Sequence, residues 1–181
     1  SSKINLRENE TYLTRDLLEA VLICSANDAS VALACDIAGT EEAFVRMMNN
    51  RARQLGALNT NFVNSTGLPT KGQYTSAYDL VVIMKRALIY PEIIEIMTKR
   101  DSPIKSDKGR LIGLKSHNKL LWEFDNAIIG KTGYTRQAGH CFVGLQKIKN
   151  RKFLFAILKS KDPRPDIRII YSTLTQLINN R

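Results

Sequence analysis

The chain has 181 residues, a net charge of +10, and 44% hydrophobic and 24% charged residues. This composition suits one globular domain with a sizeable core and excludes a disordered or fibrous chain. No apolar run is long enough to span a membrane, and no signal peptide is visible. Lys and Arg are spread along the chain without a zinc spacing or an aromatic RNA-binding signature, so we expect no nucleic-acid partner.

The first part of the chain has the apolar periodicity of helices. Thr14 is a candidate N-cap for a helix that ends near residues 25–27, where an alanine-rich helix follows directly. Thr40 and Ser76 are candidate N-caps of two further helices, and Pro91 begins a shorter one. We therefore expect an all-helical region in the first half.

The second half has the pattern of strands. Residues 110–114 form a candidate strand, and 140–146 and 152–159 form a candidate strand pair joined by the polar turn 148–151. Residues 165–179 predict a final helix. Its inward-facing residues are expected to be Ile167, Ile170, Leu174 and Leu177. This order of elements predicts an α+β fold with an antiparallel sheet and a helical layer, rather than a parallel doubly wound sheet.

The chain contains three cysteines, Cys24, Cys35 and Cys141. An odd count argues against a pure disulfide framework, and none has the spacing of a metal site. Cys35 lies among alanines and Val31 on a predicted helix, which favours a buried free thiol. We therefore expect no metal site built on these cysteines.

Lys131-Thr132-Gly133 is a candidate part of an acyl-transfer site. Hydrolysis of a peptide that ends in a carboxylate needs a nucleophile, a proton shuttle, an oxyanion hole and a carboxylate clamp. Lys131 supplies a cation on or beside a strand, and Thr132 supplies a hydroxyl donor. Gly133 leaves room for a substrate backbone at the strand edge, where the N–H of Tyr134 can contribute to the oxyanion hole.

Ser25-Ala26-Asn27 lies upstream at a predicted helix junction. Ser25 is a candidate proton relay, and Asn27 is a candidate donor to a substrate carbonyl. Either tripeptide alone is common as a turn or helix cap, but together they match two of the three motifs of a penicillin-interacting site. The third motif, a nucleophilic Ser followed by Lys one helical turn later, does not occur before Ser25.

Five segments resemble, in the same order, the serine D-alanyl-D-alanine carboxypeptidases, which are the low-molecular-mass penicillin-binding proteins. These segments are Leu17–Gly39, Asn61–Pro69, Ser76–Leu80, Asn118–Trp122 and Gly130–Thr135, followed by Ala138-Gly139. The resemblance extends over nearly the whole chain. It implies a β-lactamase/transpeptidase-like fold, in which helices cover an antiparallel sheet and the active site lies between the sheet edge and an all-helical region.

The resemblance also implies an activity. A Ser of such enzymes attacks the penultimate D-Ala carbonyl of the peptidoglycan pentapeptide, releases the terminal D-Ala and is freed by water, without a metal or organic cofactor. β-Lactams acylate the same Ser. The family works outside the cytoplasm, in the periplasm or on the outer face of the bacterial membrane, often through a C-terminal amphipathic helix. This chain shows no such anchor, so we expect any peripheral membrane association to involve segments outside it.

The nucleophile is the main departure from the family pattern. Ser102–Lys105 is a polar, loop-like stretch, and Ser116–Lys119 falls in the Asn-x-Leu-Leu region, so neither Ser-x-x-Lys match fits the expected helix start. We expect residues 1–181 to form a single domain whose nucleophile lies upstream of Ser1, and the chain alone to be inactive. Arg168 is our candidate contact for the substrate carboxylate, with Arg164 left open as its alternative.

Two other functions are compatible with the motifs. A class A β-lactamase needs a deacylating Glu between them, but Glu92 and Glu95 lie on a predicted helix without a Glu-x-x-Leu-Asn pattern. A non-catalytic peptidoglycan-binding scaffold of the same fold is the second alternative. The intact Ser25, Asn27 and Lys131 argue against it, because such side chains are expected to be lost first once catalysis is lost.

Overall fold

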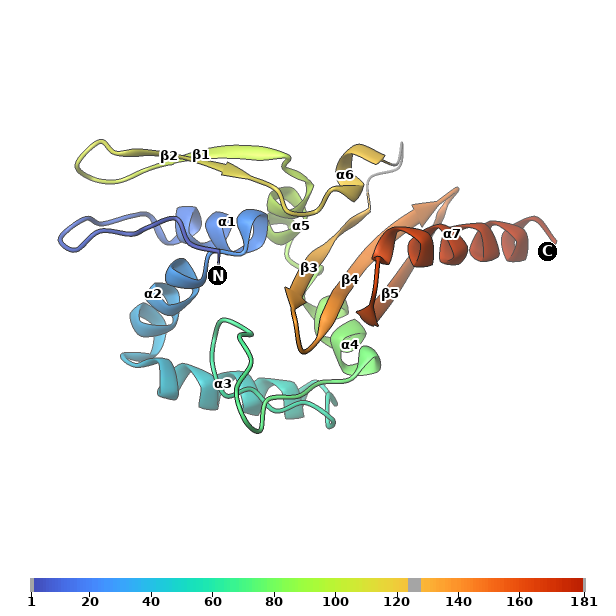
Figure 1. Ribbon diagram of the computed structural model, residues 1–181, viewed down its shortest axis with the longest axis horizontal. Helices are drawn as coiled ribbons and strands as arrows, with labels where there is room; N and C mark the ends of the chain where they lie inside the picture. The colour runs from blue at the N-terminus through green and yellow to red at the C-terminus, as the bar shows by residue number, and fades with distance from the viewer. Residues whose placement is uncertain (1, 124–127, 181) are drawn as a thin grey trace.

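The computed structural model describes residues 2–123 and 128–180. Helices fill the first half, and strands dominate the second (Figure 1). The helices are α1 (Thr14–Cys24), α2 (Asn27–Ala38), α3 (Glu41–Gln54), α4 (Ala77–Ala87), α5 (Pro91–Thr98), α6 (Leu120–Glu123) and α7 (Pro163–Asn179). The strands are β1 (Asp101–Lys105), β2 (Leu111–Lys115), β3 (Ile129–Thr135), β4 (Gly139–Ile148) and β5 (Arg151–Ser160).

Strands β3, β4 and β5 form an antiparallel sheet with helices on both faces. On one face, Val143 of β4 packs with Met84 of α4 and Met97 of α5. On the other face, Phe142 packs with Phe155 and with Ile167 of α7, as Figure 1 shows for the elements. Successive residues of β4 point to opposite faces, so one strand supplies both cores. The α+β architecture is therefore confirmed.

Two predicted helix caps are present and one prediction was wrong. The hydroxyl of Thr40 accepts the N–H of Ala43 at 3.1 Å, and that of Ser76 accepts the N–H of Asp79 at 3.1 Å. Thr14 does not cap α1, because the helix already includes it and the N-cap position is occupied by Leu13 without a side-chain bond. Helix α1 is instead stabilised by packing of its apolar side.

The stretch at Ser102 is a strand, and the expectation of a loop was wrong. Strand β1 pairs antiparallel with β2, and this two-stranded sheet packs on α1. Ile104 and Leu114, both 2% exposed, fill the gap between this sheet and Ile23. One fully buried side chain on each five-residue strand, with Ile112 packed beside them, stabilises the hairpin, although Pro103 and the charged residues around it indicate a loop.

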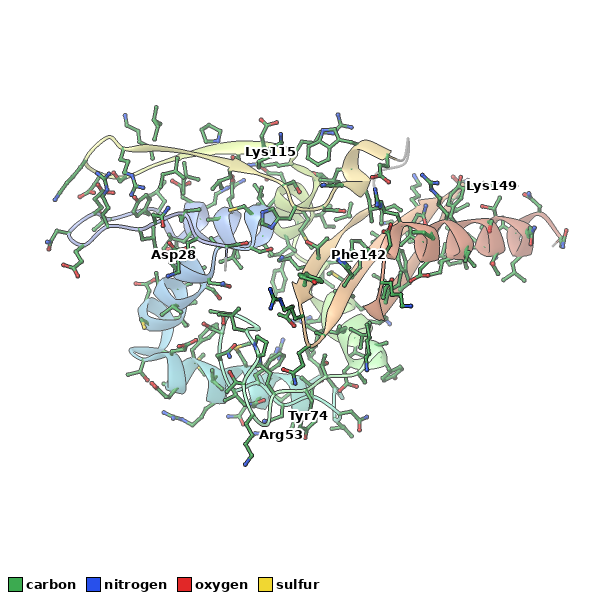
Figure 2. The ribbon with its side chains drawn as sticks, viewed as in Figure 1. Asp28, Arg53, Tyr74, Lys115, Phe142 and Lys149 are labelled. Atoms are coloured by element: carbon green, nitrogen blue, oxygen red, sulfur yellow. The ribbon has the colours of Figure 1, made fainter. Side chains whose placement is uncertain are left out.

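Helices α1 and α2 approach closely because small residues line their junction. Ala20, Ala26 and Ala29 are almost completely buried there. The carboxylate of Asp28, labelled in Figure 2, accepts the backbone N–H groups of Ile4 and Leu6, each at 3.1 Å. This carboxylate anchors the segment before α1 to the helical region.

Two expectations about single side chains were wrong. Cys35 is exposed, because it lies on the outer side of α2, whereas Leu33 and Ala34 face the core. Leu177 is 56% exposed, while Ile167 at the other end of α7 is completely buried. Helix α7 thus packs on the sheet mainly through its first half. None of the helices in the described residues is both long enough and apolar enough to span a bilayer.

Gly130 and Gly144 face each other across β3 and β4. A Cβ atom on Gly130 would overlap the ring of Phe142 and the backbone of residues 143 and 144. A Cβ atom on Gly113 of β2, in contrast, would meet no atom within 4 Å. The absence of a side chain at residue 130 is therefore what lets β3 lie close to β4.

Replacing Gly130 with Ala should destabilise the chain by about 3 kcal/mol, because overpacking against backbone cannot be relieved by a rotamer change. The matched change Gly113→Ala should alter the free energy of unfolding by less than about 0.5 kcal/mol. Urea unfolding followed by circular dichroism measures both. Equal effects of the two substitutions would show that the close approach of β3 to β4 at residue 130 leaves room for a Cβ atom.

Candidate active site

Lys131 of β3 and Ser25 at the end of α1 meet at the junction between the sheet and the helical region. The Lys131 ammonium donates hydrogen bonds to the Ser25 hydroxyl and, at 2.9 Å, to the carbonyl of Thr132. The two side chains are 106 residues apart in the sequence. The fold thus brings together the two motifs that the sequence singled out.

Ser25 has a left-handed backbone, with φ 57° and ψ 39°, at the C-terminal end of α1. This conformation is uncommon for residues other than Gly, Asn and Asp. It is held in place by hydrogen bonds from Ala26 N–H to the Ala20 carbonyl at 3.1 Å and from Asn27 N–H to the Ser2 carbonyl at 2.9 Å. The turn directs the Ser25 hydroxyl toward the sheet edge, and the energetic cost of its backbone fits a functional site.

Burial lowers the pKa of Lys131 from its ordinary value of 10.5 to about 8, and the neighbouring Cys24 thiol opposes this shift. Among residues 2–123 and 128–180, no carboxylate lies within ion-pair distance of its ammonium group. A desolvated cation without a counter-ion releases its proton easily. Lys131 and the Ser25 hydroxyl can therefore exchange protons close to neutral pH.

His117 and Asn118 belong to this site, although sequence reasoning gave them no catalytic or positioning role. The pKa of His117 is lowered by burial and by the positive charge of Lys131, so the imidazole lies within electrostatic range of the ammonium. The backbone N–H of His117 donates a hydrogen bond to the Ile23 carbonyl at 3.0 Å. Asn118 is buried and donates to the Ile128 carbonyl at 2.7 Å, just before β3. These bonds position the strand that carries Lys131 against α1.

The edge of β3 is open next to the Lys131 ammonium. In a β-strand the N–H and C=O groups of one residue point to the same side, and residues two apart share that side. The Thr132 carbonyl accepts a hydrogen bond from Lys131, so it points to the unpaired edge of β3. The N–H of Tyr134 points to the same edge. A Cβ atom on Gly133 would touch only Cys141, at 3.9 Å. The strand therefore has free backbone donors and free space where an extended ligand can lie.

The other site residues predicted from the sequence differ in how they are connected to the contact between Lys131 and Ser25. Asn27 is the first residue of α2, and its side-chain amide makes no hydrogen bond within the described residues, so it is available to a ligand. Arg168 is exposed on α7, and no contact links it to the Lys131 motif. Arg164, one turn earlier, pairs with Asp162 at 2.8 Å. Asp162 in turn interacts electrostatically with His140, whose ring lies 4.4 Å from that of Tyr134.

Neither Ser-x-x-Lys match has the geometry of an activated nucleophile. The hydroxyl of Ser102 lies on β1 and donates to the Glu19 carboxylate at 2.6 Å, in a network that includes Lys99. The hydroxyl of Ser116 accepts the N–H of Asn118 at 3.2 Å, and Lys119 is exposed just before α6. Both serines lie outside helices, so their lysines cannot lie one helical turn away.

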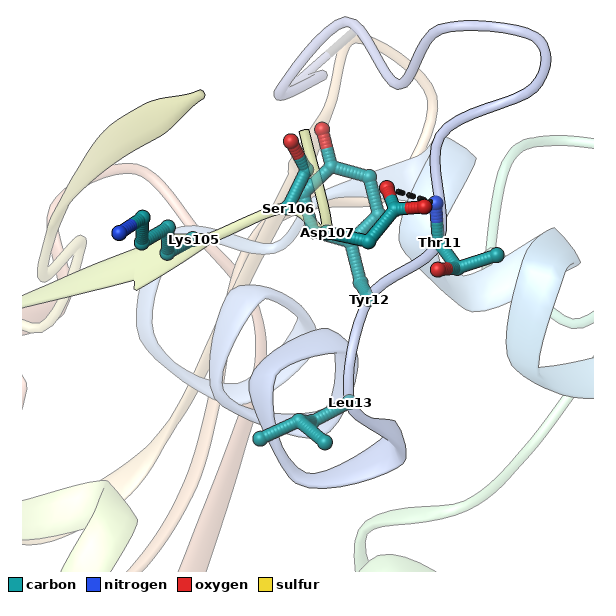
Figure 3. A pocket seen from close by; sticks show the side chains of 6 residues that line it. All are labelled: Thr11, Tyr12, Leu13, Lys105, Ser106 and Asp107. Carbon is teal, nitrogen blue, oxygen red and sulfur yellow. Dashed lines mark hydrogen bonds between the residues drawn. The ribbon is translucent and has the colours of Figure 1, made fainter. Parts of the chain in front are cut away.

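A cavity of about 250 Å³ lies elsewhere, between the segment before α1 and the β1–β2 hairpin (Figure 3). Its walls are Thr11, Tyr12, Leu13, Lys105, Ser106 and Asp107. The Asp107 carboxylate accepts the N–H of Thr11 at 2.8 Å, which closes one side. None of the motif residues lines this cavity. Within the described part of the chain, no group of three His, Cys, Asp or Glu side chains is placed to hold a metal ion.

The lowered pKa of Lys131 predicts a pH-dependent cost to folding. Between about pH 8 and pH 10.5 the unfolded chain binds more protons at this lysine than the folded chain does, so stability rises with pH in this window. Lys131→Met should be more stable than the parent chain at pH 7, and this advantage should shrink by about 3 kcal/mol by pH 10.5. Urea unfolding at both pH values measures the difference, and a constant difference would contradict a depressed pKa.

Residues 1–162 of the chain match the family model of D-alanyl-D-alanine carboxypeptidases. It is 34% identical over 163 residues to the D-alanyl-D-alanine carboxypeptidase DacF of Bacillus subtilis, covering 90% of this chain and 42% of DacF. It is 36% identical over 165 residues to DacD of Escherichia coli, covering 90% of this chain and 41% of DacD. The chain thus spans about two fifths of the length of these curated relatives.

Solved structures agree with these matches. A D-alanyl-D-alanine carboxypeptidase from Mycobacterium tuberculosis H37Rv is 31% identical, with a TM-score of 0.80 over 87% of this chain and 60% of that one. A mutant of the Streptomyces K15 DD-transpeptidase is 24% identical, with a TM-score of 0.84 over 99% of this chain and 72% of that one, and it shares the fold. The chain therefore belongs to the peptidase S11 family of D-alanyl-D-alanine carboxypeptidases.

Proposed function

We propose that these residues form the greater part of the active site of a serine D-alanyl-D-alanine carboxypeptidase that trims peptidoglycan stem peptides. The contact between Lys131 and Ser25 is the observation that carries the proposal. It places a cation of low pKa beside a hydroxyl, at the open edge of a strand. The identity to carboxypeptidases along most of the chain supports the same reaction.

The nucleophile is proposed to come from a Ser-x-x-Lys segment outside the 181 residues. Both internal matches have their serine hydroxyls engaged away from a helix start, as described above. The Ser25 hydroxyl is itself bonded to Lys131 and is not followed by a Lys one turn later. In this proposal residues 1–181 belong to one domain together with that segment.

The reaction follows from the geometry in two steps. The nucleophilic oxygen bonds to the carbonyl carbon of the penultimate D-Ala, the C–N bond to the terminal D-Ala breaks, and the hydroxyl proton passes through Ser25 to the leaving amine. Lys131 stabilises the relay by donating to Ser25. The N–H of Tyr134 and the nucleophile's own N–H stabilise the oxyanion. A water molecule then bonds through its oxygen to the acyl carbon, the ester bond between that carbon and the nucleophilic oxygen breaks, and a proton of the water passes to the nucleophilic oxygen.

The substrate lies along the open edge of β3 in this proposal. Gly133 leaves space for its backbone, and Asn27 donates to a substrate carbonyl. The Thr132 hydroxyl binds the terminal carboxylate with help from an arginine. Arg168 was our candidate from the sequence, but Arg164 pairs with Asp162, whose carboxylate is within electrostatic range of His140. The ring of His140 lies 4.4 Å from that of Tyr134, the residue next to Gly133. We therefore favour Arg164 as the second carboxylate contact.

The proposed partners and location follow from the chemistry. Peptidoglycan pentapeptides are the substrates, and β-lactams, which carry a reactive amide beside a carboxylate, acylate the same serine. Because peptidoglycan lies outside the cytoplasmic membrane, the protein is proposed to act in the periplasm or on the outer face of that membrane. Removal of the terminal D-Ala limits cross-linking, which connects the activity with cell-wall formation and cell shape.

The two alternatives have less support. Glu95 is about half exposed and pairs with Arg15 at 2.7 Å, and Glu92 lies exposed in the first turn of α5, so neither is placed to activate a water at Lys131. This argues against a class A β-lactamase. A non-catalytic scaffold has no need for the strained Ser25 or for an unpaired buried Lys131.

Intact-mass spectrometry after incubation with benzylpenicillin tests the proposal. The 181-residue chain should show no covalent adduct, whereas a version extended upstream through a Ser-x-x-Lys segment should gain the mass of one penicillin. In the extended protein, Lys131→Ala should slow adduct formation by at least about 100-fold, while the exposed Lys119→Ala should not, because only Lys131 contacts Ser25. An adduct on the short chain would contradict the external nucleophile, and none on the extended protein would favour the scaffold.

A further inference from the structure

The turn between β4 and β5 carries a dense group of cations. Lys147, Lys149, Arg151 and Lys152 occupy four of the six positions from 147 to 152, and all four side chains are exposed. We call residues 147–152 the hairpin tip. Within residues 2–123 and 128–180, none of the ion pairs includes a residue of the hairpin tip. Four positive charges are therefore concentrated in one turn, and none of them forms an ion pair with a carboxylate of the described residues.

The cations of the hairpin tip repel one another. Lys147 and Lys152 are directly paired across the two strands, so their Cβ atoms lie about 5 Å apart on the same face. Like charges in this arrangement destabilise a hairpin. Lys149 adds a second unfavourable feature, because its φ of 51° is rare for a residue with a long side chain. A turn that violates two local rules indicates a function, and an anionic partner would neutralise the repulsion.

The hairpin tip projects from the molecule together with the end of α7. The Lys149 ammonium donates to the side-chain carbonyl of Asn179 at 2.6 Å. Leu177, two residues earlier on α7, is 56% exposed. This end therefore combines cations with an exposed aliphatic side chain on a protruding turn. Such a shape fits a flat anionic surface better than a linear polyanion, which needs a groove to follow.

The hairpin tip lies at the far end of the sheet from the candidate active site. Lys131 pairs with Val143 of β4, and the five strand residues from Val143 to Ile148 separate it from the hairpin tip by roughly 17 Å. Figure 2 places Lys149 on the opposite side of the molecule from Arg53 on α3. Residues 132–134 at the open edge of β3 pair with residues 140–142 of β4, toward the opposite end of that strand from the hairpin tip.

We propose that the hairpin tip docks the protein on a bilayer of anionic phospholipids, with the candidate active site held away from the lipid. The net charge of +10 favours the approach, and the hairpin tip provides the contact. Each Lys or Arg close to an anionic bilayer strengthens binding roughly five-fold. This differs from the expectation that membrane association lies wholly outside the chain, and it does not depend on the acyl-transfer chemistry.

Vesicle flotation tests the proposal with the full 181-residue chain. Vesicles with about 30 mol% phosphatidylglycerol in phosphatidylcholine should bind the chain, pure phosphatidylcholine should not, and binding should fall steeply from about 0.05 M to about 0.5 M salt. The triple change Lys147→Gln, Arg151→Gln and Lys152→Gln should weaken binding about 100-fold. The matched triple on α3, Arg46→Gln, Arg51→Gln and Arg53→Gln, removes the same charge from exposed positions and should weaken it less than about three-fold.

The single change Lys152→Glu separates binding from folding. It turns the repulsive pair with Lys147 into an attractive one, so the chain should be slightly more stable and yet bind the vesicles at least about ten-fold more weakly. Equal losses from the two triple variants, or no binding to anionic vesicles, would overturn the proposal. A soluble polyglycerol phosphate could also release the chain from the vesicles. If it did so at a phosphate concentration below that of the vesicle lipids, the proposal would be overturned in favour of a polymer ligand.

Discussion

A lysine ammonium held beside a serine hydroxyl, with no carboxylate partner among the described residues, is the interaction on which the candidate site depends. Lys131 is partly buried between the sheet and α1, and desolvation lowers its pKa to about 8. The remainder of the fold has to hold this unfavourable arrangement together. It does so through the strained turn at Ser25, the short approach of β3 to β4 and the bonds of His117 and Asn118.

A second lysine in the same fold shows the contrast. Lys99 donates to the nearly buried Glu19 at 2.7 Å, and Ser102 donates to the other oxygen of the same carboxylate. This paired cation joins α1, the end of α5 and β1, so its charge is balanced and its role is structural. Lys131 lies beside the thiol of Cys24 and the imidazole of His117 instead. The difference in partners, rather than in residue type, distinguishes the reactive lysine from the structural one.

Much of the architecture could be predicted from the sequence where the signal is local. The caps at Thr40 and Ser76 and the strand pair follow from short-range patterns. The pairing of the Ser25 and Lys131 motifs, 106 residues apart, follows instead from their match to a known set of motifs. Strand β1 was missed because its two inward residues are Ser102 and Ile104, so only one of them is apolar and the sequence shows no hydrophobic alternation. The role of His117 was missed because it depends on where the fold places Lys131. The position of Arg164 relative to Tyr134 depends on where helix α7 begins, just after Asp162. Such features are set by tertiary contacts that no local pattern contains.

The ionisation of Lys131 tests this account most directly. Selective ¹⁵N labelling of lysine, with Lys131→Met to assign the signal, allows the Nζ resonance to be followed by NMR from neutral to alkaline pH. The account predicts a midpoint near pH 8, well below the ordinary 10.5, because the ammonium is desolvated beside Ser25. A midpoint at the ordinary value would mean that Lys131 is solvated and that the sheet edge and α1 do not form the site described above.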